Sequence, residues 1–149
     1  MDIAFLTLED VLALQDELIQ RYGGAPGLRD AGLLEAALAM PQAGFGGQYF
    51  HEFPHEMGAA YLFHLVRNHA FIDGNKRVAL AYALLFFKIN RVGYKITEEE
   101  AVELTLAGAS GRMDKGALTS FFRQHLTIQH NPDAGAQKNP RAVRQPPEG

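Results

Sequence analysis

The feature that most constrains the fold is a pair of segments that are apolar on nearly every side, separated by a short polar stretch. The first runs from Pro54 to about Asn68, and the second runs from about Asn75 to about Arg91. A helix without a wide polar face belongs in the interior of a domain, because only there are all its sides covered. We therefore predict a buried helical hairpin at the centre of the molecule, with a polar connector between its two helices.

Shorter helices are predicted around this hairpin from their start signals. These signals are Thr7 before 8–22, Asp30 before a segment that ends ahead of Pro41, a capping box at 97–100, and Asp114 before the last helix. The glycine- and aromatic-rich stretch 41–53 predicts an irregular loop or a short flap. The fold class is therefore all-α: a single compact bundle of about six helices over residues 1–128, followed by a disordered tail over 129–149.

Composition excludes several classes of function. The chain has 14 Lys and Arg residues against 17 Asp and Glu residues and a net charge of −3, so direct nucleic-acid binding is not expected. Cysteine is absent, which excludes disulfide frameworks and thiolate metal sites. The longest apolar run, 78–87, is about half of what a bilayer crossing requires, and the N-terminus does not resemble a secretory signal. We expect a cytoplasmic protein without a membrane partner.

The connector between the two apolar segments concentrates polar groups where burial would penalise them. Gly74 and Asn75 open the second helix, so its free backbone N–H groups and the positive end of its dipole lie at the connector. Lys76 and Arg77 add two cations to the same turn. A helix N-terminus supplemented in this way is a candidate phosphate-binding site.

Two further residues of the connector carry candidate chemistry. Asp73 offers the hard carboxylate oxygens that Mg²⁺ prefers, and His69 is able to act as a neutral base on a hydroxyl. Together with the phosphate site, these are the parts that phosphoryl or nucleotidyl transfer requires. From the residues alone a structural alternative stays open, in which Asp73 and Asn75 only cap the helix and Gly74 only makes the turn.

The run His69-x-Phe71-x-Asp73-Gly74-Asn75-Lys76-Arg77 resembles the central motif of the Fic/Doc superfamily, and more narrowly that of the Doc toxins of bacterial toxin–antitoxin pairs. Segments of the N-terminal third resemble the family's pattern too, namely 5–11, 22–24, 27–30, 32–35 and 41–42. The resemblance covers about residues 3–126 and implies the helical Fic/Doc fold.

The resemblance also implies roles for the motif: His69 as the base that deprotonates a target hydroxyl, Asp73 as the Mg²⁺ ligand, Gly74 and Asn75 as the anion hole, and Lys76 and Arg77 as phosphate- and nucleotide-binding residues. ATP is the implied phosphate donor. The implied target is a hydroxyl of a translation factor similar to elongation factor Tu, whose phosphorylation arrests protein synthesis.

Two departures bear on which group is transferred, and a third bears on whether the chain is fully active. Family members that transfer AMP carry glycine where this chain has Lys76 and a second arginine where it has Leu80, and both differences resemble the Doc toxins. Val78 stands where relatives have threonine, which removes a hydroxyl from the first turn. An AMP transferase using the same connector and a non-catalytic binding module remain the alternatives.

Regulation is expected in trans. Some Fic proteins carry an inhibitory helix with a Ser or Thr followed four residues later by Glu, and no Ser or Thr of this chain has Glu at that spacing. The resemblance therefore implies a Phd-type antitoxin, whose disordered C-terminal segment folds into a helix on the toxin.

Two other histidine features receive structural interpretations. The run 51–55 matches the metalloprotease pattern H-E-x-x-H, but Pro54 lies inside it and disfavours the continuous helix that this zinc site needs. His64 lies on the first helix of the buried hairpin; we expect a hydrogen-bonded core histidine, and the alternative is a side chain that reaches the connector.

Overall fold

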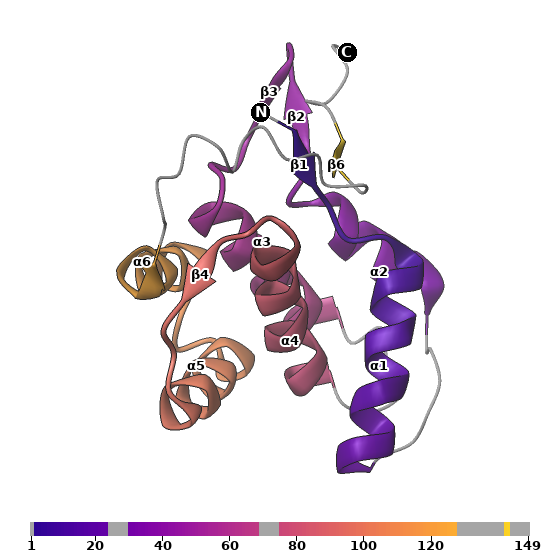
Figure 1. The fold of residues 1–149 in the computed structure, drawn as a ribbon, viewed down its shortest axis with the longest axis vertical. Coiled ribbons are helices and arrows are strands. Elements are labelled where there is room, and N and C mark those ends of the chain that lie inside the picture. Colours follow the sequence, from indigo (N-terminus) through magenta and orange to yellow (C-terminus); the bar gives the residue numbers. More distant parts are fainter. Residues whose placement is uncertain (1, 24–29, 69–74, 128–141, 144–149) are drawn as a thin grey trace.

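The computed structural model describes residues 2–23, 30–68, 75–127 and 142–143, which form a helical domain with a few very short strands (Figure 1). The helices are α1 (Leu8–Tyr22), α2 (Ala31–Ala39), α3 (His55–Asn68), α4 (Asn75–Ile89), α5 (Glu98–Ser110) and α6 (Lys115–His125). The predicted all-α fold with about six helices is confirmed for these residues. The boundary predicted at residue 128 stays a prediction.

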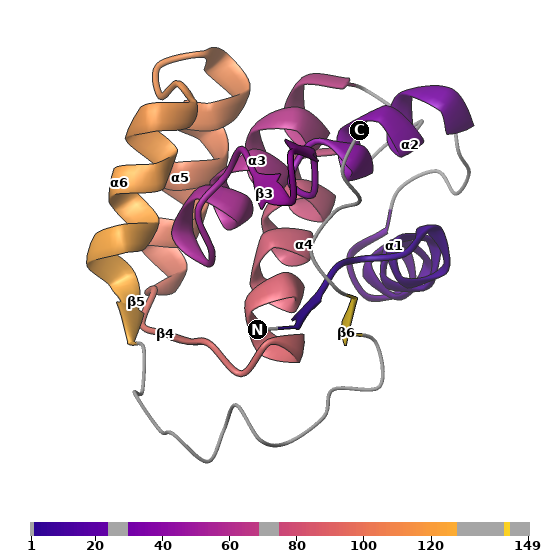
Figure 2. The ribbon, with the colours of Figure 1, turned by 90° about the horizontal axis from the view of Figure 1, so that it is seen from above.

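Helices α3 and α4 lie side by side in the centre, with α1 and α2 on one side and α5 and α6 on the other (Figures 1 and 2). Their fully buried side chains include Tyr61, Tyr82, Phe86 and Phe87. The two helices approach so closely that a Cβ atom on Gly58 would overlap the ring of Phe87. The predicted buried hairpin is therefore confirmed, and close packing against α3 holds α4 in place.

Six two-residue strands form three antiparallel pairs in the described part of the chain. The strands are β1 (Ile3–Ala4), β2 (Gly44–Phe45), β3 (Gln48–Tyr49), β4 (Gly93–Tyr94), β5 (Leu126–Thr127) and β6 (Ala142–Val143). The β2–β3 hairpin lies in the stretch 41–53 for which a loop or flap is predicted, while β4 pairs with β5 and β1 pairs with β6. Strands of two residues carry no readable alternation, so the sequence analysis missed them.

The predicted helix starts are confirmed by their caps. Thr7 and Thr97 each accept a hydrogen bond from the third residue of the helix within a capping box, and the carboxylates of Asp30 and Asp114 cap α2 and α6. These caps depend only on residues three apart, which is why the sequence reveals them.

Two boundaries differ by one or two residues from prediction. Helix α3 begins at His55, one residue after Pro54, whose carbonyl oxygen accepts the hydrogen bond from the Gly58 N–H. Helix α4 ends at Ile89, and Arg91 adopts a positive φ of 61° just beyond it. The N–H groups of both Asn90 and Val92 bond to the carbonyl of Phe87 in this turn.

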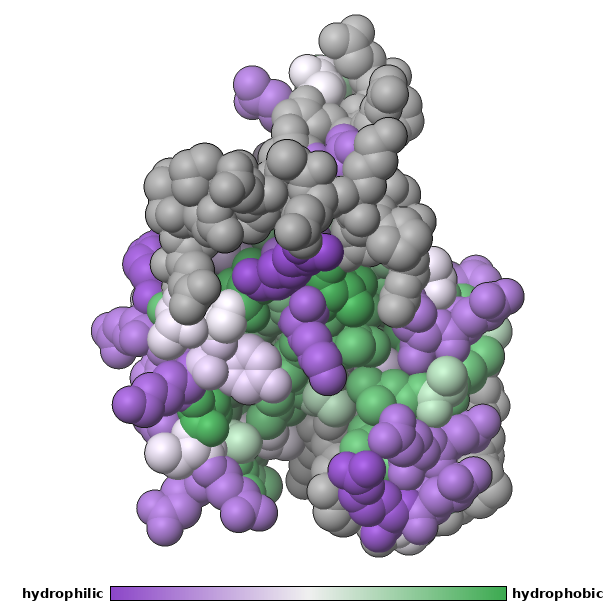
Figure 3. Space-filling model, viewed as in Figure 1, coloured by the Kyte–Doolittle hydropathy of each residue, from purple (hydrophilic) through white to green (hydrophobic). Residues whose placement is uncertain are grey.

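The surface is mostly polar, with local apolar areas. Figure 3 shows apolar side chains reaching the surface in the middle of one face, between α4 and α1, with polar side chains around them. Phe45 and Phe50 of the β2–β3 region are each 67% exposed. No described helix has both the length and the apolar character needed to cross a bilayer.

Candidate functional site

The candidate site lies where α3 ends and α4 begins. Helix α3 ends at Asn68, and α4 starts at Asn75, as the sequence predicts. Asn75, Lys76 and Arg77 therefore form the first turn of α4, whose backbone N–H groups have no carbonyl acceptor within the helix. The predicted residues His69, Asp73 and Gly74 lie outside the described residues, as do the side chains of Asn75, Lys76 and Arg77.

The start of α4 is fixed by burial of the residues that follow it. Ala79 is fully buried, and Leu80 is only 8% exposed. Within the next two turns, Tyr82 and Phe86 are completely enclosed. An apolar anchor of this kind holds the helix N-terminus in one position, as a preorganised anion site requires.

On the side of α3 that faces α6, a second group of basic residues comes together. The Nζ atom of Lys115, the first residue of α6, lies 3.3 Å from Nε2 of His51 and 5.6 Å from the centre of the Phe63 ring. The guanidinium carbon of Arg67 lies 4.9 Å from the centre of the same ring. The pairing of Lys115 with His51 is not predictable from the sequence, since 64 residues separate them.

One ring nitrogen of His64 lacks the hydrogen bond expected of a core histidine. Its Nε2 atom is buried without a partner, although the ring packs edge-on against Phe63. Burial, and then the charges of Lys115 and His51, lower the pKa of His64 from its ordinary 6.5 to about 4. At Nε2 the structure therefore departs from the expected hydrogen-bonded core histidine, and the ring lies in a basic environment that lowers its pKa.

The metalloprotease interpretation of 51–55 is excluded in the way predicted. His51 precedes the helix and contacts Lys115, whereas His55 is the first residue of α3. Ligand atoms of Glu52, His55 and Glu56 do lie within 4.8 Å of one another. We assign no ion to this group, because Glu52 is largely exposed and the positive end of the α3 dipole disfavours a cation there.

Comparison with known proteins decides the family. The sequence profile of the Fic/DOC family matches residues 5–87, which span α1, the connector and most of α4. The chain belongs to the Fic/DOC family. It is 36% identical over 116 residues to a protein named "Protein kinase doc" of Escherichia phage P1, covering 78% of this chain and 90% of the relative. It is 44% identical over 88 residues to "Toxin Doc" of Mycolicibacterium smegmatis, covering 59% of this chain and 65% of the relative.

The Fic/DOC assignment covers the whole of the predicted motif. The matched residues 5–87 include His69 to Arg77 and the central α3–α4 hairpin that carries them. Lys115 and the rest of α6, which packs against α3, lie outside the matched range. The other residues of the basic group, His51, Phe63 and Arg67, lie within it.

Proposed function

We propose that this chain is the toxin of a toxin–antitoxin pair and that it transfers phosphate from ATP to a hydroxyl of a translation factor similar to elongation factor Tu. The observation that carries the proposal is the start of α4 at Asn75, within the motif, on a helix whose later residues are buried in the core. The names of the two relatives, a kinase and a toxin, support the same activity.

In the proposed reaction, the first turn of α4 binds the phosphates. The backbone N–H groups at Asn75 and the side chains of Lys76 and Arg77 neutralise charge on the transferred group. His69 accepts the proton of the target hydroxyl as its oxygen bonds to the γ-phosphorus, and the bond from that phosphorus to ADP breaks. Asp73 has the donor chemistry to hold Mg²⁺, which when bound neutralises phosphate charge.

Phosphate transfer is favoured over AMP transfer by two positions of α4. Leu80 occupies the position of the second arginine of AMP-transferring members, and it is 8% exposed within the core cluster. A buried leucine offers no cation at that position to bind a second phosphate group. Lys76 adds bulk and charge in the first turn. The proposed arrangement therefore offers the γ-phosphate, rather than the α-phosphate, to the attacking oxygen.

The experiment that tests the activity uses the full chain, Mg²⁺, elongation factor Tu and a bacterial lysate. Parallel reactions contain ATP labelled on the γ-phosphate and ATP labelled on the α-phosphate, and mass spectrometry identifies the modified residue. We expect transfer of the γ label only. Transfer of the α label would establish the AMP transferase instead, and no transfer would favour the binding module.

A matched pair of histidine variants tests the proposed base. His69→Ala should lower the rate of transfer by about 10²–10⁴, the usual contribution of a positioned base. His64→Gln changes a half-buried histidine of the neighbouring helix, and it should retain the activity. Unchanged transfer by His69→Ala would contradict the mechanism.

Restraint by a Phd-type antitoxin is part of the proposal, since the chain has no internal Ser/Thr-x₃-Glu brake. Co-expression with the neighbouring small open reading frame should restore growth, and the two proteins should co-purify. Harmless overexpression of a catalytically competent chain on its own would contradict the toxin assignment while leaving the transferase intact.

A further inference from the structure

The start of α6 places a lysine where helix electrostatics disfavour it. Lys115 is the first residue of the helix, at the positive end of its dipole, next to the N-cap Asp114. The Asp114 carboxylate already accepts the N–H of Ala117 at 2.8 Å. Among the described residues, no carboxylate lies within ion-pair distance of Lys115. The contacts of its ammonium group are instead the His51 imidazole and the Phe63 ring.

The polar contact of Lys115 is an imidazole. Its Nζ atom lies 3.3 Å from Nε2 of His51. An ammonium group only donates hydrogen bonds, so Nε2 of His51 must accept, and the His51 ring is neutral with its proton on Nδ1. An amine in hydrogen-bond contact with a neutral imidazole has a proton acceptor already in place, which is the arrangement of a nucleophile with its base.

The surroundings lower the pKa of both groups. Burial lowers the pKa of Lys115. Burial and the Lys115 charge lower the pKa of His51, while Glu56 and the Met40 carbonyl act in the opposite direction. The Phe63 ring opposes deprotonation of Lys115 only weakly, since 5.6 Å is near the limit of a cation–π contact. Lys115 nevertheless remains partly exposed, so a small reagent reaches it.

We propose that Lys115 is a site of acylation, activated by His51, for anionic donors that carry an acyl group on a phosphate or a thiol. His51 Nε2 takes one proton from the ammonium group of Lys115. The freed amine attacks the acyl carbon, an amide bond forms, and the bond to the donor's oxygen or sulfur breaks. The departing phosphate or thiolate takes the second proton of the amine, and His51 returns its proton to water.

The charge around Lys115 suits a donor of this kind. Arg67 and Lys115 both contact the Phe63 ring, so two cations lie on one side of α3. His64, nearby, has a pKa lowered to about 4, so its ring adds no charge at neutral pH. An acyl phosphate or an acyl thioester of coenzyme A carries phosphate charge that this surface attracts. The inference does not depend on the activity proposed for the connector.

The test treats the full-length protein with acetyl phosphate and, in a parallel arm, with acetyl-coenzyme A, and follows each lysine by peptide mass spectrometry. Lys88 and Lys95, both exposed, are the internal references. Lys115 should be acetylated about tenfold faster than either reference, a small part of the 10²–10⁴ that a positioned base supplies in an enzyme. The faster arm identifies the donor class. Equal rates at the three lysines in both arms would overturn the proposal.

Two variants test whether His51 itself, rather than the surroundings of Lys115 in general, accelerates the acetylation. His51→Gln keeps an acceptor for the Lys115 N–H but takes up no proton, so acetylation of Lys115 should fall to the rate of Lys88. His64→Gln removes the neighbouring imidazole that does not accept from Lys115, and the fast rate should persist. Circular dichroism confirms that both variants fold. A Lys115 rate in His51→Gln that still exceeds the references tenfold would show that His51 is not the base.

Discussion

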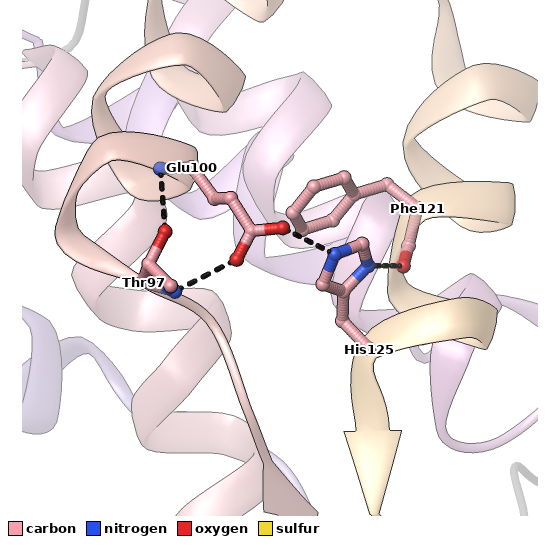
Figure 4. Close-up of polar contacts among 4 residues, drawn as sticks. All are labelled: Thr97, Glu100, Phe121 and His125. Carbon is pink, nitrogen blue, oxygen red and sulfur yellow. Dashed lines mark hydrogen bonds and ion pairs between the residues drawn. The ribbon is translucent and has the colours of Figure 1, made fainter.

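The two ends of α6 use the same kinds of residue to opposite effect. At the C-terminal end, His125 has a partner at each ring nitrogen: Nε2 lies 2.7 Å from Oε2 of Glu100, and Nδ1 lies 2.8 Å from the carbonyl oxygen of Phe121 (Figure 4). At the N-terminal end, Nδ1 of His51 and Nε2 of His64 are buried without partners beside Lys115. At the C-terminal end both imidazole nitrogens are paired, whereas these two imidazole nitrogens at the N-terminal end are not.

The difference follows from the helix dipole and from the available acceptors. Basic residues in the last turn, such as Arg123 and His125, interact favourably with the negative end of α6, and Glu100 and Phe121 supply acceptors. Lys115 lies at the positive end and contacts a neutral imidazole instead of a carboxylate. A polar cluster that does not stabilise the fold is a candidate for chemistry, and this contrast is what the following predictions test.

The largest expected effect comes from removing the cap that holds the N-terminal end of α6 in place. Asp114→Ala loses the hydrogen bond from the Ala117 N–H and the negative charge beside Lys115. The free energy of unfolding should fall by about 1–2 kcal/mol, as for other N-cap substitutions. Urea denaturation measures this loss. Asp114→Asn, which keeps an acceptor, should recover most of it, and equal losses in the two variants would contradict the cap.

The second prediction concerns pH. The pKa of His64 is about 4 in the folded protein, against about 6.5 when it is exposed, so the unfolded chain binds more protons between these values. Stability should therefore decrease as the pH falls from about 6.5 towards about 4, by roughly 1 kcal/mol after allowance for the partial exposure of the ring. Thermal unfolding across this range measures the slope, and His64→Gln should reduce it. An unchanged slope in that variant would assign the proton uptake elsewhere.

The C-terminal end should respond in a different pH window. Hydrogen bonds from the Thr97 backbone and from His125 hold the pKa of Glu100 below its ordinary 4.5. Its contribution to stability is therefore complete above pH 4.5 and is lost as the pH falls through the lower folded value. Glu100→Gln should remove the loss below that pH and leave the slope due to His64 intact. If Glu100→Gln instead removed the loss of stability that occurs above pH 5, the stability effects at the two ends of α6 would be coupled.

The contrast between these ends also shows what the sequence is able to predict. The Thr97 capping box and the Asp114 cap depend on residues three positions apart, and both were predicted and confirmed. The central hairpin was predicted because apolar residues on every side of a helix need burial, which is a property of each segment alone. The family motif was likewise recognisable because its residues are contiguous from His69 to Arg77.

What the sequence missed depends on contacts between distant residues. His51 and Lys115 meet only because the segment before α3 folds back against the start of α6, 64 residues later. His64 was predicted to form a hydrogen bond, yet no acceptor or donor from a packed element reaches its Nε2. Neither periodicity nor spacing encodes which partner a folded chain brings to a side chain, so such clusters are found only in three dimensions.

The smallest expected effect concerns the charge of Lys115 itself. Lys115→Gln removes a cation from the positive end of α6, where no carboxylate of the described residues pairs with it, so the free energy of unfolding should stay unchanged or rise by about 0.3 kcal/mol. Lys88→Gln is the matched control, because Lys88 lies in the last turn of α4, where a cation is favourable, and its loss should lower stability slightly. Urea denaturation of both variants in low salt, where surface electrostatics are least screened, gives the comparison. A greater loss in Lys115→Gln than in Lys88→Gln would show that the ammonium group stabilises the start of α6, and the contrast between the two ends of this helix would then have to be given up.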